Sequence, residues 1–145
     1  MKKKFGQNFL RNKEIINEII NIAEIDENSI IYEIGPGDGA LTKEIINKNP
    51  KKFLSVEIDL SLKDQLNSLF VKKEHSIIFT DALKFDETSH FIGDAIVIGN
   101  LPYNISLKLL IKWIYQHATK PWFKKMILMF QKEVAERIIS DENSK

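Results

Sequence analysis

The sequence predicts an α/β protein with a doubly wound, mostly parallel sheet that carries helices on both faces. Segments with strand character alternate with segments of helical periodicity along the chain. The strand segments are apolar throughout, as is typical of parallel strands buried on both faces. Right-handed crossovers between such strands give an open sheet, whose ligands bind beyond the carboxyl ends of the strands.

Five short apolar segments predict the strands. The first runs into the glycine-rich turn Gly35–Gly39, and the fourth runs into the segment Gly99–Tyr103. Both segments therefore lie at the edge of the sheet where ligands are expected. The predicted strands are residues 29–34, 53–58, 76–79, 95–98 and 126–130.

Apolar residues at helical spacing predict the helices between the strands. Asn12 is a suitable N-cap for the first helix, which extends to Ala23. A second helix contains Leu41 to Ile46 and ends at Asn49-Pro50, because proline cannot continue a helix. The remaining helices are predicted at residues 60–71, 106–117 and 133–139. In the helix at 106–117, the inward side is predicted to hold Leu109, Leu110, Trp113 and Ile114.

The composition fits one globular domain and excludes several kinds of site. The chain has 145 residues, of which 43% are hydrophobic and 28% charged. The lack of cysteine excludes disulfides, thiolate zinc sites and a cysteine nucleophile. The three histidines are not clustered as zinc ligands are, so we expect no metal. The net charge of +1 gives no overall attraction to nucleic acid, although Lys2–Lys4 and Arg11 make the N-terminus basic.

The sequence contains no signal for a membrane. No apolar run approaches the ~20 residues that a membrane span needs. The first residues also lack the apolar region of a signal peptide. We therefore expect a cytoplasmic protein that does not bind a membrane.

The glycine turn predicts a ligand site. Glycine allows a tight turn and lets a ligand approach the backbone, and the following helix offers free N–H groups. Gly35, Gly37 and Ala40 formally match the dinucleotide fingerprint. Asp38 argues against a bound phosphate, which it would repel, and tolerates a cationic ligand. The alternative is a tight turn with no ligand.

Two acids at the same edge favour a nucleoside ligand. Glu57 ends the second predicted strand, 18 residues after Gly39, near the place where doubly wound folds bind ribose hydroxyls. Asp59 begins the next loop and is less suited to that role. Asp81 follows the third strand and can accept from an adenine amine. Nucleotide redox chemistry and methyl transfer both remain open at this point.

The segment Asn100-Leu101-Pro102-Tyr103 favours methyl transfer to an adenine. Pro102 makes Leu101 extended and removes one N–H, so the loop presents carbonyl oxygens with few local donors. The Asn100 amide oxygen and the Pro102 carbonyl can hold the two N–H groups of an adenine amine, with its lone pair turned to a methyl donor. Tyr103 offers a face on which the base stacks. The alternative is an ordinary turn before the helix at Ser106.

This scheme needs no strong general base. The methylated nitrogen is acidic and loses its proton to water, so catalysis consists mostly of positioning and dipole placement.

At this point the sequence resembles the small-subunit ribosomal RNA adenine N6,N6-dimethyltransferases. The matching blocks cover nearly the whole chain in the order of the family. They are Phe5–Leu10, Glu33–Thr42, Val56–Asp59, Asp81–Leu83, Asn100–Ser106 and Phe130–Arg137. The resemblance implies a Rossmann-like methyltransferase fold and RNA binding. It also implies transfer of methyl groups to two adjacent adenines near the 3′ end of that RNA, in ribosome biogenesis.

The resemblance also implies a cofactor and roles for single residues. The cofactor is S-adenosylmethionine, in a domain that spans residues 1–145. The segment 1–11 closes over the cofactor, with contacts from Asn8 and Leu10. Of the other implied cofactor-binding residues, Gly35 lies on the methionine side, Glu57 on the ribose, Asp81 on the adenine and Asn100 near the methyl group. Gly37 and Ala82 are also expected to bind the cofactor. The implied catalytic residues are Asn100, Pro102 and Tyr103.

One departure from the family opens alternatives. Chains of the family continue into a C-terminal helical domain that helps to grip RNA, so we expect a truncated chain that lacks it and acts as a monomer on the assembling small subunit. One alternative is a fragment that binds cofactor without turnover. Others are a large-subunit rRNA adenine dimethyltransferase and a nicotinamide dehydrogenase.

Overall fold

A five-stranded sheet forms the centre of the computed structural model, which describes residues 9–140. The strand order is β3-β2-β1-β4-β5, and every neighbouring pair runs parallel. The chain changes direction across the sheet between β1 and β4, so the predicted doubly wound sheet is confirmed. The strands are β1 (Ile30–Ile34), β2 (Lys52–Glu57), β3 (His75–Phe79), β4 (Ala95–Asn100) and β5 (Phe123–Met129).

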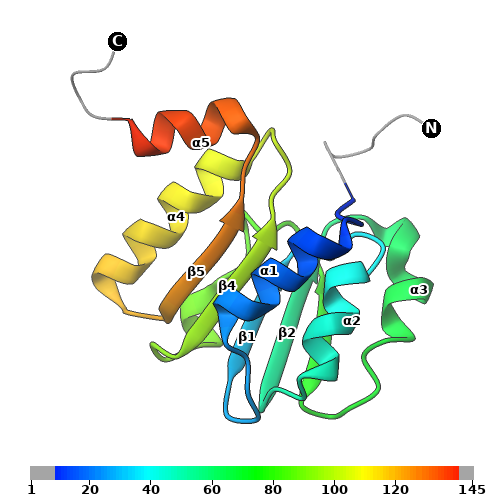
Figure 1. Ribbon diagram of the computed structural model, residues 1–145. Coiled ribbons are helices and arrows are strands. Elements are labelled where there is room, and N and C mark those ends of the chain that lie inside the picture. The colour runs from blue at the N-terminus through cyan, green and yellow to red at the C-terminus, as the bar shows by residue number, and fades with distance from the viewer. Residues whose placement is uncertain (1–8, 141–145) are drawn as a thin grey trace.

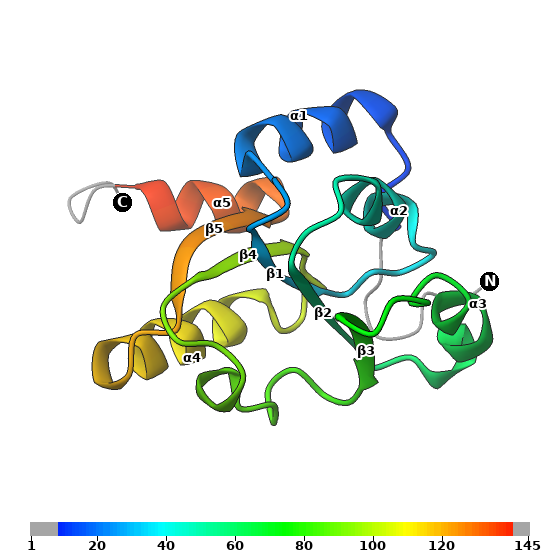
Figure 2. The ribbon, with the colours of Figure 1, turned by 90° about the horizontal axis from the view of Figure 1, so that it is seen from below.

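Helices cover both faces of this sheet, as predicted. α1 and α2 lie on one face and α4 lies on the other (Figures 1 and 2). None of the helices within residues 9–140 has the length and apolar character that crossing a membrane requires. The helices are α1 (Lys13–Ala23), α2 (Ala40–Asn47), α3 (Lys63–Asn67), α4 (Ser106–Thr119) and α5 (Lys132–Ile139), with 3₁₀ turns η2 (Leu60–Leu62) and η3 (Glu87–Ser89).

The sheet separates two hydrophobic clusters. The cluster beneath α4 contains Tyr32 and Trp113, and the cluster beneath α1 and α2 contains Ile31 and Ile45. All four side chains are fully buried. Ile31 and Tyr32 are neighbours on β1 and enter opposite clusters, because successive side chains of a strand point to opposite faces. Burial on both faces explains why the strand segments are apolar at nearly every position.

The region predicted as one helix over residues 60–71 is instead η2 followed by the short α3. The side chain of Asp59 accepts hydrogen bonds from the backbone N–H of Ser61 at 3.0 Å and from its hydroxyl at 2.7 Å. This cap holds the chain in a 3₁₀ turn before α3 begins. Leu66 is the buried residue of α3, so apolar burial along this stretch is weak.

Two strands and one helix face also differ from the prediction. β4 continues to Asn100, so this residue ends a strand, and β5 begins earlier than predicted, at Phe123. Ile114 was predicted to face inward, but it is 53% exposed. Leu109 and Trp113 form the buried stripe of α4, and Ile114 lies beside that stripe.

The N-cap of α1 provides a test of the local structure. The Asn12 side chain accepts from the backbone N–H groups of Glu14 at 3.0 Å and Ile15 at 3.2 Å. We expect Asn12→Ala to lower the free energy of unfolding by about 1 kcal/mol, because these donors lose their acceptor. Urea denaturation measures the change. Asn17→Ala, at an exposed position within α1, is the control, and an equal loss in both variants would contradict the capping role.

Candidate functional site

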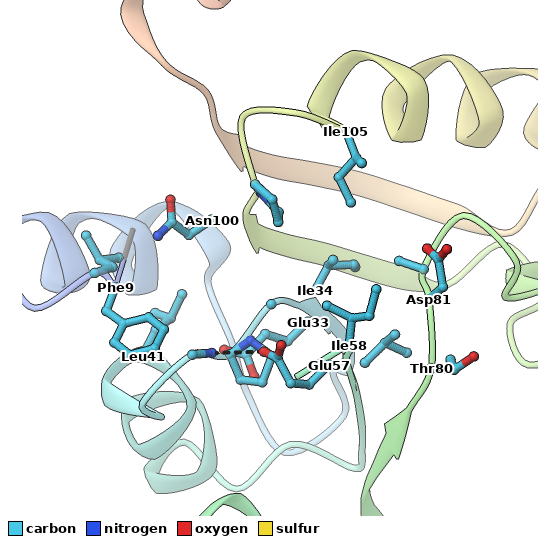
Figure 3. Close-up of a pocket in the computed structure, with 17 residues that line it drawn as sticks. Phe9, Glu33, Ile34, Leu41, Glu57, Ile58, Thr80, Asp81, Asn100 and Ile105 are labelled. Carbon is cyan, nitrogen blue, oxygen red and sulfur yellow. Dashed lines mark hydrogen bonds between the residues drawn. The ribbon is translucent and has the colours of Figure 1, made fainter. Parts of the chain in front are cut away.

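A pocket opens at the carboxyl edge of the sheet, where β1, β2 and β4 end (Figure 3). Its empty volume is about 730 Å³, part of which is open to solvent. Its lining residues come from five separate segments of the chain. They are Phe9, Leu10, Glu33, Ile34, Gly35, Pro36, Gly37, Leu41, Val56, Glu57, Ile58, Thr80, Asp81, Ala82, Asn100, Pro102 and Ile105.

Most of the site residues predicted from the sequence meet in this pocket. Those that line it together are Leu10, Gly35, Gly37, Glu57, Asp81, Ala82, Asn100 and Pro102. Tyr103 does not line it and is 54% exposed. Asn8 lies outside the described residues.

The glycine turn after β1 folds over the end of β2. Gly35 donates its N–H to the carbonyl of Val56 at 3.0 Å, and Gly37 donates to the carboxylate of Glu57 at 3.3 Å. Gly35 and Gly37 have φ angles of +69° and +59°, a region that side-chain-bearing residues rarely adopt. A Cβ at Gly35 would lie 3.4 Å from the carbonyl oxygen of Asn100. This distance is an ordinary van der Waals contact, so the positive φ angle, and not a lack of space, is what favours glycine at position 35.

Glu57 is held in place by the backbone on two sides. One carboxylate oxygen accepts from Gly37, and the other accepts from the N–H of Asp59 at 2.9 Å. The side chain is buried, and burial raises the pKa of the Glu57 carboxyl. Asp59 caps η2 and is not among the lining residues of the pocket. Of these two acids, the structure brings Glu57 to the cavity.

Asp81 and Ala82 form the opposite wall of the pocket, directly after β3 and Thr80. The backbone N–H of Thr80 donates to the carbonyl of Glu57 at 3.0 Å, which joins this wall to the end of β2. The carboxylate of Asp81 accepts from the N–H of Leu83 at 2.9 Å. In Figure 3, Asp81 lies in the segment after β3, and Glu57 lies at the end of β2, on a different part of the cavity wall.

The segment after β4 is arranged differently from what the sequence predicted. The carbonyl of Pro102 accepts from the N–H of Ile105 at 3.2 Å. The expectation that this loop has few local donors is therefore wrong for Pro102, because the turn before α4 supplies one. A carbonyl oxygen has two lone pairs, so this bond leaves capacity for a second donor.

The N-terminal segment lies on the glycine turn. Phe9 contacts this turn so closely that a Cβ at Gly37 would lie 2.8 Å from its ring. The Arg11 guanidinium forms an ion pair with Asp38 at 2.6 Å. This pair offsets the negative charge of Asp38, so that residue would repel a bound phosphate less than the sequence suggested.

Glu33 is the main pocket residue that the sequence analysis missed. It is buried, and it accepts from the hydroxyl of Thr42 at 2.9 Å and from that of Ser55 at 3.2 Å. Burial raises the pKa of Glu33 to about 7, against the lowering effect of the two hydroxyls and with a further increase from Glu57. A usable signal was present, because Glu33 is a charged residue within an otherwise apolar strand, two positions before the glycine turn. The other lining residues that were missed are Phe9, Ile34, Pro36, Leu41, Val56, Ile58, Thr80 and Ile105.

Glu33 predicts a pH dependence of stability. Because its pKa is raised from 4.5 to about 7 on folding, the folded protein binds a proton more tightly than the unfolded chain. The stabilisation that this proton gives to the folded state is fully present below pH 4.5, and it is lost as the pH rises through about 7. Between pH 5 and pH 8, we expect the free energy of unfolding of the wild type to fall by about 2.5 kcal/mol relative to that of Glu33→Gln.

Urea denaturation of both proteins at the two pH values measures this difference. Glu57 shifts in the same direction and is present in both proteins, so its effect cancels in the comparison. If the free energies of unfolding of the wild type and of Glu33→Gln changed equally with pH, the raised pKa of Glu33 would be contradicted.

The described residues contain no group of three or more histidine, cysteine or acidic side chains that could hold a metal ion.

Comparison with known proteins identifies the family. The family model described as ribosomal RNA adenine dimethylase matches residues 1–145. The chain is 46% identical over 143 residues to ribosomal RNA small subunit methyltransferase A of Pelagibacter ubique, covering 99% of this chain and 54% of that protein. For the protein of the same name from Wolbachia pipientis wMel, the identity is 44%, covering 99% and 50%.

Solved structures agree with this assignment. A dimethyladenosine transferase from Plasmodium falciparum superposes with a TM-score of 0.78 at 31% identity, covering 92% of this chain and 47% of that chain. The 23S rRNA methyltransferase ErmE gives a TM-score of 0.71 at 26% identity, covering 89% and 50%. The chain spans about half the length of the curated relatives it matches. Because the family model matches the sequence from end to end, the chain belongs to the ribosomal RNA adenine dimethylase family.

Proposed function

We propose that the protein is an S-adenosylmethionine-dependent methyltransferase that dimethylates the amines of two adjacent adenines near the 3′ end of small-subunit ribosomal RNA. The observation that carries this proposal is the meeting of Glu57, Asp81 and Asn100 in one pocket, in a chain of this family. We place the protein in the cytoplasm, where it acts as a monomer on the assembling small subunit in ribosome biogenesis.

The charge of the pocket fits a cationic cofactor. Within residues 9–140, the lining contains the carboxyl groups of Glu57 and Asp81 and no lysine or arginine. Glu33 also lines the pocket, but with a pKa of about 7 it carries only part of a negative charge at neutral pH. A sulfonium cation is favoured in such a site, whereas the pyrophosphate of a dinucleotide is not. This supports S-adenosylmethionine over a nicotinamide cofactor, although both are compatible with a glycine turn.

The residues around the pocket suggest how the cofactor would be held. The carboxylate of Glu57 would accept from the ribose hydroxyls, and Asp81 beside Ala82 would bind the adenine. Gly35, Gly37, Leu10 and Asn8 would surround the methionine part, with the segment 1–11 closing over it. The cofactor supplies an electrophilic methyl group on a sulfonium.

The segment after β4 would hold the target base. The Asn100 amide oxygen and the second lone pair of the Pro102 carbonyl would accept from the two N–H groups of the adenine amine. The exposed face of Tyr103 would stack on the base, which leaves its duplex or loop to reach the pocket. The nitrogen lone pair would then form the bond to the methyl carbon while the bond from that carbon to the sulfonium sulfur breaks, which leaves S-adenosylhomocysteine as the neutral thioether. The amine proton would leave to water. Positioning in a preorganised polar site provides the catalysis.

Two other functions remain as rivals. A large-subunit rRNA adenine dimethyltransferase would use the same pocket, and ErmE shares the fold. The curated relatives named above act, by their names, on the small subunit, which favours that substrate. The second rival is cofactor binding without turnover, motivated by the half-length match to relatives.

A methylation assay tests the proposed function. Supplied with unmethylated small subunits and methyl-labelled S-adenosylmethionine, the protein is expected to produce labelled dimethyladenosine. Mapping of the modified nucleotides distinguishes small-subunit from large-subunit activity. Absence of labelled adenine, together with tight cofactor binding by calorimetry, would instead support the binding-only function.

Asn100 separates binding from turnover. We expect Asn100→Ala to bind S-adenosylmethionine nearly as tightly as the wild type and to lose at least about 100-fold in turnover, because one acceptor for the adenine amine is removed. Calorimetry and the methylation assay measure the two effects. Asn47→Ala, at an exposed position at the far end of α2, is the control. Equal losses of binding and turnover would contradict the role given to Asn100.

A further inference from the structure

A buried polar cluster lies behind the Asp81–Ala82 wall of the pocket, on the face of the sheet covered by α4. We call it the Glu87 cluster; it consists of Tyr32, Glu87, Lys112 and Trp113. Glu87 is 0% exposed. It accepts from the Tyr32 hydroxyl at 2.9 Å, from the Trp113 indole N–H at 2.8 Å and from the Lys112 ammonium at 3.0 Å.

Lys112 connects this cluster to the pocket wall. Its ammonium group donates to the carbonyl oxygen of Ala82 at 2.6 Å, to the carbonyl of Phe85 and to the carboxylate of Glu87. An ammonium group has three N–H donors, and each of these acceptors takes one. Lys112 itself does not line the pocket, whereas Ala82 does. The lysine therefore contacts the pocket wall on the side that faces away from the cavity.

The segment held by Lys112 is a tight turn. The carbonyl of Asp81 accepts from the N–H of Lys84 at 2.9 Å, and that of Ala82 accepts from Phe85 at 3.4 Å. The contact with Lys112 thus fixes the backbone that carries the Asp81 carboxylate into the cavity. Figure 2 shows the connection between β3 and β4, which contains this turn, on the same face of the sheet as α4.

α4 also begins at the opposite side of the site. Its first residue, Ser106, follows closely after Asn100–Tyr103, and its hydroxyl contacts the carbonyl of Tyr103 at 3.5 Å. One helix therefore follows the end of the proposed base-binding segment and also makes the contact to Ala82. A buried ion pair is seldom more stabilising than apolar packing of similar volume. Its presence here fits a positional role for Lys112.

We propose that Lys112 is a positioning residue, which sets the Asp81–Ala82 wall so that this wall recognises the adenine of the cofactor. This inference rests on the proposed function, because it assigns that wall to the adenine end of S-adenosylmethionine. Glu87 orients the lysine ammonium, and Tyr32 and Trp113 orient Glu87. Loss of the lysine is expected to weaken selection of the adenine amine more than binding of the rest of the cofactor.

The test compares two ligands that differ at that amine. S-adenosylhomocysteine carries the adenine amine, and S-inosylhomocysteine carries an oxygen in its place. Calorimetry gives the affinity of each ligand for the wild type, for Lys112→Met and for the double variant Lys112→Met with Glu87→Gln. The double variant is needed because the single change leaves Glu87 buried without its cation, which can prevent folding. The change Glu87→Gln removes the charge and keeps an amide oxygen as acceptor for Tyr32 and Trp113.

We expect the double variant to lose about tenfold in affinity for S-adenosylhomocysteine and little for S-inosylhomocysteine. Lys108→Met, at an exposed position one turn earlier on α4, should leave both affinities unchanged. Thermal unfolding shows that each variant is folded.

Two results would overturn the inference. An unchanged preference between the ligands, which includes an equal loss of affinity for both, would reduce the Glu87 cluster to a structural role while the proposed function stands. A wild type that binds neither ligand would overturn the proposed function and this inference with it.

Discussion

The hydrogen bonds between the glycine turn and the end of β2 are the constraint on which the site depends. β1 and β2 are paired so that Ile34 lies opposite Val56. The N–H of Gly35 continues this pairing to Val56, and the N–H of Gly37 then reaches the carboxylate of Glu57. The chain can make both contacts because the two glycines adopt positive φ angles. As a result, an acid from one strand is enclosed by the turn that follows its neighbour.

The same turn determines which other parts of the chain reach the cavity. The carbonyl of Asn100 lies beside Gly35, so the end of β4 is close to the turn that encloses the acid at the end of β2. Phe9 packs on Gly37, and Arg11 pairs with Asp38, so these two residues cover the turn. One glycine-rich loop thus organises the proposed cofactor site and the proposed base site together.

Two buried carboxyl groups support this arrangement by different means. Glu33 has two hydroxyl partners and no cation among its hydrogen bonds within residues 9–140, and its pKa rises to about 7. Glu87 is paired with Lys112 and accepts from two further donors. Burying a charged carboxylate costs free energy. Glu33 reduces this cost by binding a proton, whereas for Glu87 the ion pair with Lys112 offsets it. Glu33 lies beneath the glycine turn and Glu87 lies behind the Asp81–Ala82 wall, so each supports a different side of the pocket.

The sequence by itself determined the α/β class, the order of the elements and the residues at the carboxyl ends of the strands. These follow from local periodicity, apolar runs and the conformational properties of glycine and proline. It also placed Glu57, Asp81 and Asn100 at one edge, because parallel strands share that edge. Only the tertiary structure decided that Pro102 bonds to Ile105, that Glu33 lines the pocket and that Lys112 holds Ala82. Such contacts join residues through side-chain direction and packing between elements, which spacing along the chain does not encode.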